Sequence, residues 1–159
     1  MCEEMKLISA GLLMYSFNSD ELMVFLVHPG GPFFESRDNG IWSIPKGLVH
    51  KDEDFFEAAV REFNEETGIT PNGHYINLDT VKLKSGKIVY GWAFKAEYAS
   101  DIVIESNTFS MKWPPIFGKY QAFPECDMGK YFNVEQAKIK INPRQIPFIE
   151  RLEDHLKKN

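Results

Sequence analysis

The sequence lacks the features that mark several large classes of protein. Its two cysteines, Cys2 and Cys126, are too few and too far apart for a disulfide framework or a Cys-x-x-Cys metal pair. It has no run of eighteen apolar residues, and the acidic start Met1–Glu4 differs from the basic start of a secretory signal. We therefore expect free thiols in a reducing, cytoplasmic compartment, and no membrane partner.

An excess of basic residues is also missing. The chain carries 18 lysines and arginines against 23 acidic residues, a net charge of −5. Nonspecific nucleic-acid binding depends on basic contacts to phosphates, so nucleic acid is not an expected partner. The negative net charge is compatible with a small phosphorylated ligand, because carboxylates can bind the Mg²⁺ that accompanies its phosphates. The sequence has no repeats and no linker, so residues 1–159 are predicted to form one domain. The sequence does not determine the oligomeric state, and a homodimer is possible.

Hydrophobic periodicity predicts interleaved strands and helices. The clearest helix runs over 54–67, where Asp54 can cap the first turn and Gly68 follows the last. Its apolar stripe, spaced i, i+3, i+4 and i+7, consists of Phe56, Ala59, Val60 and Phe63. The remaining elements are predicted as strands at 7–17, 22–28, 74–83, 87–98 and 130–134, helices at 135–139 and 144–157, and an irregular segment at 100–124. The pattern favours an α/β fold, a mixed sheet between helices.

Three glutamates stand out on the predicted helix. Glu62, Glu65 and Glu66 are spaced i, i+3 and i+4, so they share one face at the edge of the apolar stripe. Like charges in one turn destabilise a helix, and Arg61 can offset part of this by pairing with Glu65. A solvated acidic face is the ordinary explanation of such a cluster. A divalent cation is the alternative, because hard cations take oxygen ligands.

A wider pattern decides between these readings. Residues 47–69 read Gly, five residues, Glu53, seven residues, then Arg-Glu-apolar-x-Glu-Glu-x-Gly-apolar. This segment resembles the Nudix box at every specified position, and a chance match in a chain of this length has a probability of roughly 10⁻⁸ to 10⁻⁷. Residues 42–47, Trp-Ser-Ile-Pro-Lys-Gly, also resemble the lead-in of many family members. The resemblance implies the Nudix fold, an α/β/α sandwich.

The resemblance also implies roles for individual residues. Glu62, Glu65 and Glu66 would ligate Mg²⁺, with Mn²⁺ as a substitute, and the main-chain carbonyl of Lys46 would add a ligand. Glu62 or a neighbouring glutamate would be the general base. Arg61 would orient the glutamates, and Glu53 would brace the loop or contact the metal from outside.

Residues outside the box are assigned more loosely. Many family members use a glutamate from another loop, for which Glu125 is the first choice and Glu97 the second. Arg37, Phe33 and Trp113, from the two long loops beside the box, and the side chain of Lys46 are assigned to substrate binding. For each aromatic residue, packing within the protein is the simpler alternative.

The predicted activity is hydrolysis of a diphosphate linkage by water attack at phosphorus. The expected substrate is a nucleoside diphosphate joined to another group, with dinucleoside polyphosphates and nucleoside triphosphates ranked first. A non-catalytic Nudix module that binds a nucleotide or a protein as a sensor is the alternative. The sequence does not identify the physiological substrate.

Overall fold

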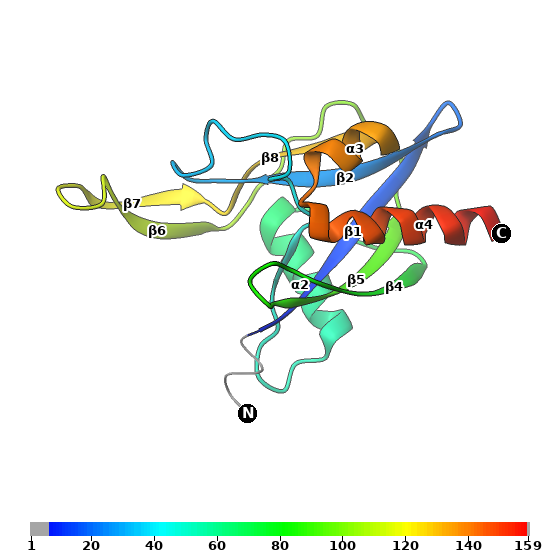
Figure 1. Ribbon diagram of the computed structural model, residues 1–159, viewed down its shortest axis with the longest axis horizontal. Helices are drawn as coiled ribbons and strands as arrows, with labels where there is room; N and C mark the ends of the chain where they lie inside the picture. The colour runs from blue at the N-terminus through cyan, green and yellow to red at the C-terminus, as the bar shows by residue number, and fades with distance from the viewer. Residues whose placement is uncertain (1–6, 159) are drawn as a thin grey trace.

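The computed structural model describes residues 7–158, so the predictions about Cys2 and about Met1–Glu4 lie outside the described residues. A twisted sheet crosses the molecule, with helix α2 against one face and helices α3 and α4 against the other (Figure 1). The strands are β1 (Ile8–Asn18), β2 (Glu21–Pro29), β3 (Lys46–Leu48), β4 (Tyr75–Lys82), β5 (Ile88–Lys95), β6 (Thr108–Trp113), β7 (Lys119–Pro124) and β8 (Cys126–Asn133). The helices are α2 (Phe55–Thr67), α3 (Val134–Lys140) and α4 (Ile146–Lys158), with a 3-10 turn at Pro143–Gln145.

The main sheet is mixed. Its strand order is β4-β5-β1-β2-β8, and β3 pairs with the first part of β1. The pairing of β1 with β5 is parallel, whereas the other pairings are antiparallel. The central strand β1 is buried over most of its length because both of its faces are covered by helices.

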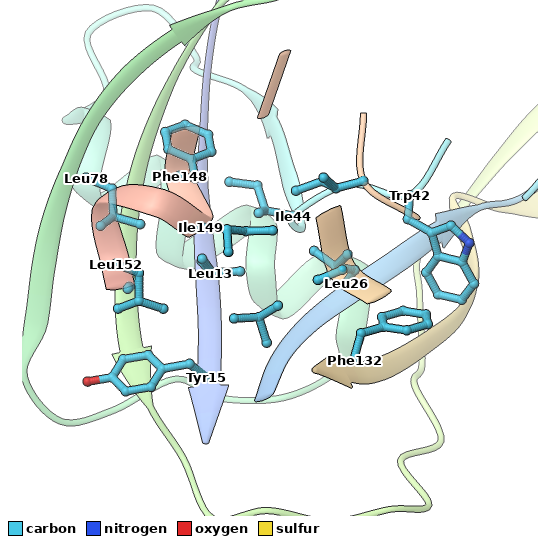
Figure 2. Close-up of a cluster of buried hydrophobic side chains, with 14 of the residues drawn as sticks. Leu13, Tyr15, Leu26, Trp42, Ile44, Leu78, Phe132, Phe148, Ile149 and Leu152 are labelled. Atoms are coloured by element: carbon cyan, nitrogen blue, oxygen red, sulfur yellow. The ribbon is translucent and has the colours of Figure 1, made fainter. Parts of the chain in front are cut away.

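Alternation along β1 divides the hydrophobic core into two layers. Leu13 and Tyr15 point toward α4, while Leu12 and Met14 point toward α2. Figure 2 shows the α4 layer, in which Phe148 and its neighbours on α4 pack over Leu13. The labelled members of that layer are Leu13, Tyr15, Leu26, Trp42, Ile44, Leu78, Phe132, Phe148, Ile149 and Leu152. This rigid double core fixes the position of α2 against the sheet.

The predicted central helix is confirmed, including its ends. The Asp54 carboxylate accepts a hydrogen bond from the Glu57 amide, and the helix ends at Thr67 before Gly68, which adopts a left-handed conformation. The buried face consists of Ala58, Ala59, Phe63 and Thr67. Phe56 and Val60 are only partly buried, so the face is rotated slightly from the predicted stripe.

Three segments of the chain differ from the prediction. The segment 100–124, predicted to be irregular, contains the antiparallel pair β6–β7, which projects from the body of the molecule (Figure 1). Strand β3 was not predicted, because three residues are too few to show a period. The last strand begins at Cys126 rather than at 130. Strands β3 and β8 are defined by pairing with the distant strands β1 and β2, which local patterns do not reveal, whereas β6 and β7 pair with each other as a local hairpin.

Candidate functional site

Arg61 lies at the centre of a hydrogen-bonded group of glutamates. Its Nε and Nη2 donate to Glu53 at 2.8 and 3.0 Å. Its Nη1 donates to Glu62 at 2.8 Å and to Glu65 at 3.2 Å. The hydrogen bonds that Arg61 donates to Glu53 lower the pKa of Glu53 to about 2, and the same bonds raise the pKa of Arg61. Arg61 therefore neutralises part of the acidic face and orients three carboxylates, including the predicted i, i+4 partner Glu65.

Glu66 points from α2 toward β3 and β8. Its Oε1 accepts from the Lys46 main-chain amide at 3.2 Å and from the Cys126 thiol at 3.4 Å. Burial raises the pKa of Glu66 to about 7, against the stabilising effect of these donors and of the Lys46 ammonium. Burial also lowers the pKa of Lys46 and raises that of the Cys126 thiol. The helix thus presents a buried carboxylate to β3, the strand at which the box begins.

Gly47 forms a cradle for the carboxylate of Glu62. A Cβ placed on Gly47 would lie 2.0 Å from Glu62 Oε2 and 2.1 Å from Glu62 Cδ, so only glycine permits this approach. The Glu62 side chain is 13% exposed, against 38% for Glu65. Burial raises the pKa of Glu62, and Arg61 opposes the shift. Glu62 and Glu66 therefore lie against adjacent residues of β3, Glu62 against Gly47 and Glu66 against Lys46.

The backbone of β3 also turns oxygen atoms toward α2. The Leu48 carbonyl accepts from Arg61 Nη2 at 3.0 Å, and the Lys46 amide donates to Glu66. The N–H and C=O of one strand residue point to the same side of the strand. The Lys46 carbonyl therefore faces α2 as well, on the side where the sequence resemblance predicts a metal ligand.

Glu125 lines a cavity together with Glu66. A cavity of about 170 Å³ is lined by Lys46, Glu66, Glu125 and Cys126, together with residues of β2 and of 41–44. Glu125 is held at its backbone, where its amide donates to Asn107 and its carbonyl accepts from Gly30. Glu97 is exposed just after β5 and does not line this cavity. The geometry favours Glu125 over Glu97 as the additional glutamate.

The donor set suits a divalent cation. Three carboxylates and a main-chain carbonyl are the oxygen ligands that Mg²⁺ takes, and the Gly47 cradle holds one of them. Among residues 7–158, however, no three His, Cys, Asp or Glu side chains are grouped closely enough to hold a metal ion. Glu62 and Glu65 are instead held by Arg61, and Glu66 by Lys46 and Cys126. The three glutamates and the Lys46 carbonyl have the oxygen atoms and the location that a divalent cation needs. In this structure the glutamate side chains form hydrogen bonds within the protein.

Comparison with known families agrees with this geometry. A family model described as the NUDIX domain matches residues 5–152. The chain belongs to the NUDIX family. Nudix hydrolase 7 of Arabidopsis thaliana is 36% identical over 62 residues, which cover 39% of this chain and 21% of that relative. Nudix hydrolase 10 of the same plant is 58% identical over 31 residues, 20% of this chain and 11% of that relative. The chain thus aligns with about a fifth or less of the length of these curated relatives.

Solved structures confirm the predicted Nudix fold. The binary complex of the C. elegans Ap4A hydrolase superposes with a TM-score of 0.67 at 21% identity, over 95% of this chain and 99% of that one. The NUDIX domain of Shewanella oneidensis NrtR complexed with ADP ribose superposes with a TM-score of 0.64 at 17% identity, over 95% and 88%. At these identities the likeness establishes the fold.

The residues predicted to bind substrate are not gathered at this Nudix site. Phe33 and Trp113 contact each other edge to face, with ring centroids 5.2 Å apart, where the 29–40 loop meets the β6–β7 pair. Arg37 lines a different cavity of about 940 Å³ beside β8, together with His28, Asp38 and Asp127. The side chain of Lys46 alone lines the same cavity as Glu66.

Two buried contacts between distant segments were not predicted from the sequence. His28 is buried at the end of β2, where Nε2 donates to the Arg37 carbonyl at 2.6 Å and Nδ1 lies 2.8 Å from Asp127. It ties the 29–40 loop to β8. Cys126 contacts Glu66 across 60 positions of the sequence. Neither the contact of His28 with Asp127 nor that of Cys126 with Glu66 has a local sequence signal, because the two residues of each contact are far apart in the sequence.

Proposed function

We propose that this Nudix protein hydrolyses a diphosphate linkage in a nucleotide-like substrate with the help of a divalent cation. One observation carries the proposal. Glu62, Glu65 and Glu66 lie on one side of α2, and Glu62 and Glu66 face the Lys46–Gly47 segment of β3. Three acidic side chains in one turn destabilise a helix, so a bound cation gives this arrangement a purpose.

The three glutamates and the Lys46 carbonyl would hold the metal. A divalent cation held there would supply positive charge against the diphosphate and would make water a better nucleophile. Arg61 keeps the glutamates on one side of the helix and, by way of Glu53, ties the helix to the loop before it. The Lys46 ammonium lies near Glu66 and Glu62 and would contact a phosphate oxygen of the substrate.

The proton of the attacking water needs an acceptor close to the metal. Glu125 lines the same cavity as Glu66 and is fixed at its main chain, so it can accept that proton without belonging to the helix. Glu62 is the second choice within the box.

For the substrate, we infer a nucleoside diphosphate joined to another group. The similar solved structures include an Ap4A hydrolase and a NUDIX domain complexed with ADP ribose, and both Ap4A and ADP ribose contain such a linkage. Dinucleoside polyphosphates and nucleoside triphosphates stay ranked ahead of ADP ribose. Mg²⁺ is the proposed metal and Mn²⁺ its substitute.

The test is a hydrolysis screen with identified products. The protein is incubated with diadenosine polyphosphates, nucleoside triphosphates and ADP ribose, with Mg²⁺, with Mn²⁺ and with a chelator. Glu66→Gln should lower kcat by at least about 100-fold, because it removes charge from the metal site. Glu57→Gln is the matched control, since Glu57 is exposed on the first turn of the same helix and should leave kcat unchanged.

The alternative of a sensor module without catalysis gives a different result in the same screen. It predicts nucleotide binding in calorimetry with no product from any substrate. Metal-independent hydrolysis, or a Glu66→Gln variant as active as the parent, would reject the proposed mechanism.

A further inference from the structure

The β6–β7 pair forms an arm, defined here as residues 108–124, that stands away from the body of the molecule (Figure 1). Its strands pair with each other in one register, from Thr108 opposite Pro124 to Trp113 opposite Lys119. The five residues between the strands, 114–118, form its tip. At its base, the Asn107 amide donates to the Glu65 carbonyl at 2.8 Å, so the arm is attached directly to α2.

The tip of the arm exposes large apolar side chains. Ile116 is 74% exposed, Phe117 is 93% exposed, and Tyr120 beside them is 76% exposed. Isolated exposed apolar residues are common, but neighbouring ones at a projecting end mark a surface for interaction. Behind the tip, Trp113 contacts Phe33 of the 29–40 loop, and Phe33 is itself 57% exposed. The apolar surface therefore extends from the tip back to that loop.

The charge of the arm differs from that of the rest of the chain. The arm contains Lys112 and Lys119 and no acidic residue, whereas the whole chain has a net charge of −5. The register places Lys112 opposite Tyr120 and Lys119 opposite Trp113. Both lysines therefore lie at the level of the aromatic residues, one step behind Ile116 and Phe117.

This order of side chains matches the layers of a membrane surface. Apolar side chains enter the acyl boundary, tryptophan and tyrosine favour the headgroup level, and lysines reach anionic phosphates. A projecting tip also suits lipids, which rearrange around it, whereas a protein partner needs a matching hollow. We propose that the tip of the arm inserts into the interface of an anionic lipid bilayer and holds the protein reversibly at its surface.

The proposal revises the expectation of no membrane partner. Within residues 7–158 no helix is long and apolar enough to cross a membrane. That finding concerns spanning helices, whereas the arm would only reach the interface. The proposal does not depend on the proposed hydrolysis, because Ile116 and Phe117 lie at the tip and Glu66 lies on α2 beyond the base of the arm.

The test is co-sedimentation of the full chain with vesicles. One set of vesicles is phosphatidylcholine alone, and the other is phosphatidylcholine with phosphatidylglycerol at a ratio of about three to one. We expect binding to the anionic vesicles that weakens as salt is raised, and little binding to the neutral ones. The double variant Lys112→Gln/Lys119→Gln should bind about 25-fold more weakly, at about fivefold per lysine. Ile116→Ser/Phe117→Ser should lose at least about tenfold.

Matched controls separate the arm from general effects of charge and apolarity. Lys82 and Lys84 are exposed on the β4–β5 hairpin, so Lys82→Gln/Lys84→Gln removes the same charge elsewhere. Val103, 90% exposed outside the arm, provides the control Val103→Ser for the tip. Both controls should bind vesicles like the parent chain, and circular dichroism should report the same fold for all variants.

Three outcomes would overturn the proposal. In the first, the parent chain does not sediment with anionic vesicles; in the second, the tip variant sediments as well as the parent. The third outcome concerns the oligomeric state of the protein without lipid. If the parent is a dimer in light scattering and the tip variant a monomer, the tip is a contact between two copies of this chain. Hydrolysis of soluble nucleotides by the tip variant should match the parent in every case, so failure of this proposal is distinguishable from failure of the proposed function.

Discussion

Replacement of Gly47 by alanine tests whether the position of the Glu62 carboxylate matters for catalysis, because the added methyl group occupies the space of that carboxylate. The new methyl group would lie 2.0 Å from Glu62 Oε2, whereas ordinary contact begins at 3.4 Å, so the carboxylate must retreat by at least about 1.4 Å. A misplacement of about 1 Å at a catalytic group can cost about 100-fold in rate. We therefore expect Gly47→Ala to lower kcat by about 100-fold or more.

Stability should respond much less than activity. The atoms that meet the new methyl group belong to the end of a flexible glutamate side chain, which can swing aside and lose its hydrogen bond from Arg61. One such hydrogen bond contributes about 1 to 3 kcal/mol. Thermal and urea unfolding should therefore show a loss in that range, together with the much larger relative loss of kcat in the nucleotide assay.

Gly91→Ala is the control, because it should lower stability while leaving kcat unchanged. Its Cβ would lie 2.7 Å from the Phe148 ring, within the core and away from the glutamates. It should lower the free energy of unfolding by about 1 to 3 kcal/mol while the folded enzyme keeps its kcat. If Gly47→Ala retains full kcat, the position of Glu62 over Gly47 does not matter for catalysis, and the reasoning is refuted.

Three further changes test the ion pair at Glu53, the burial of Cys126 and the packing of the hydrophobic core. Glu53→Gln should lower the free energy of unfolding by about 1 to 3 kcal/mol at pH 7, because Glu53 binds Arg61 through two hydrogen bonds. In urea titrations this difference should shrink as the pH falls from 4.5 toward about 2, where the Glu53 carboxyl of the parent protonates; equal stability at pH 7 contradicts the ion pair. In a Cys2→Ser background, Cys126 should react with a thiol reagent at pH 8 only after unfolding, since burial raises its pKa; rapid reaction of the folded protein contradicts its burial. Phe148→Ala should cost about 3 to 5 kcal/mol in urea unfolding, and a cost under about 1 kcal/mol would place this ring outside the core.

The sequence predicted those parts of the fold whose signals are local. The helix over 55–67 was predicted because Asp54 and Gly68 mark its ends and its apolar period is regular. The strands β1, β2, β4 and β5 were predicted from their apolar content and from the turns between them. These segments are stabilised by residues close in sequence or by uniform burial.

The missed elements were missed for different reasons. Strand β6 alternates polar and apolar residues from Thr108 to Trp113, so its local signal was present within the segment predicted to be irregular. Strand β7 is almost wholly exposed and shows no such alternation. Strand β3 is defined by its pairing with Ser9–Gly11 of β1, about 37 residues away in sequence. The same limit applies to the site. The acidic helix could be predicted from the sequence. The contact of Glu66 with Cys126 and the hydrogen bonds that hold the main chain of Glu125 could not be predicted, because they depend on the three-dimensional fold.

The binding of Mn²⁺ measured by electron paramagnetic resonance tests the central claim most directly. We expect the parent chain to bind the ion, Glu57→Gln to bind it equally, and Glu62→Gln and Glu66→Gln to weaken binding by at least about tenfold without loss of fold. Equal Mn²⁺ affinity in all four proteins, or no binding to the parent with or without nucleotide, would contradict the claim that this turn of α2 is a metal site.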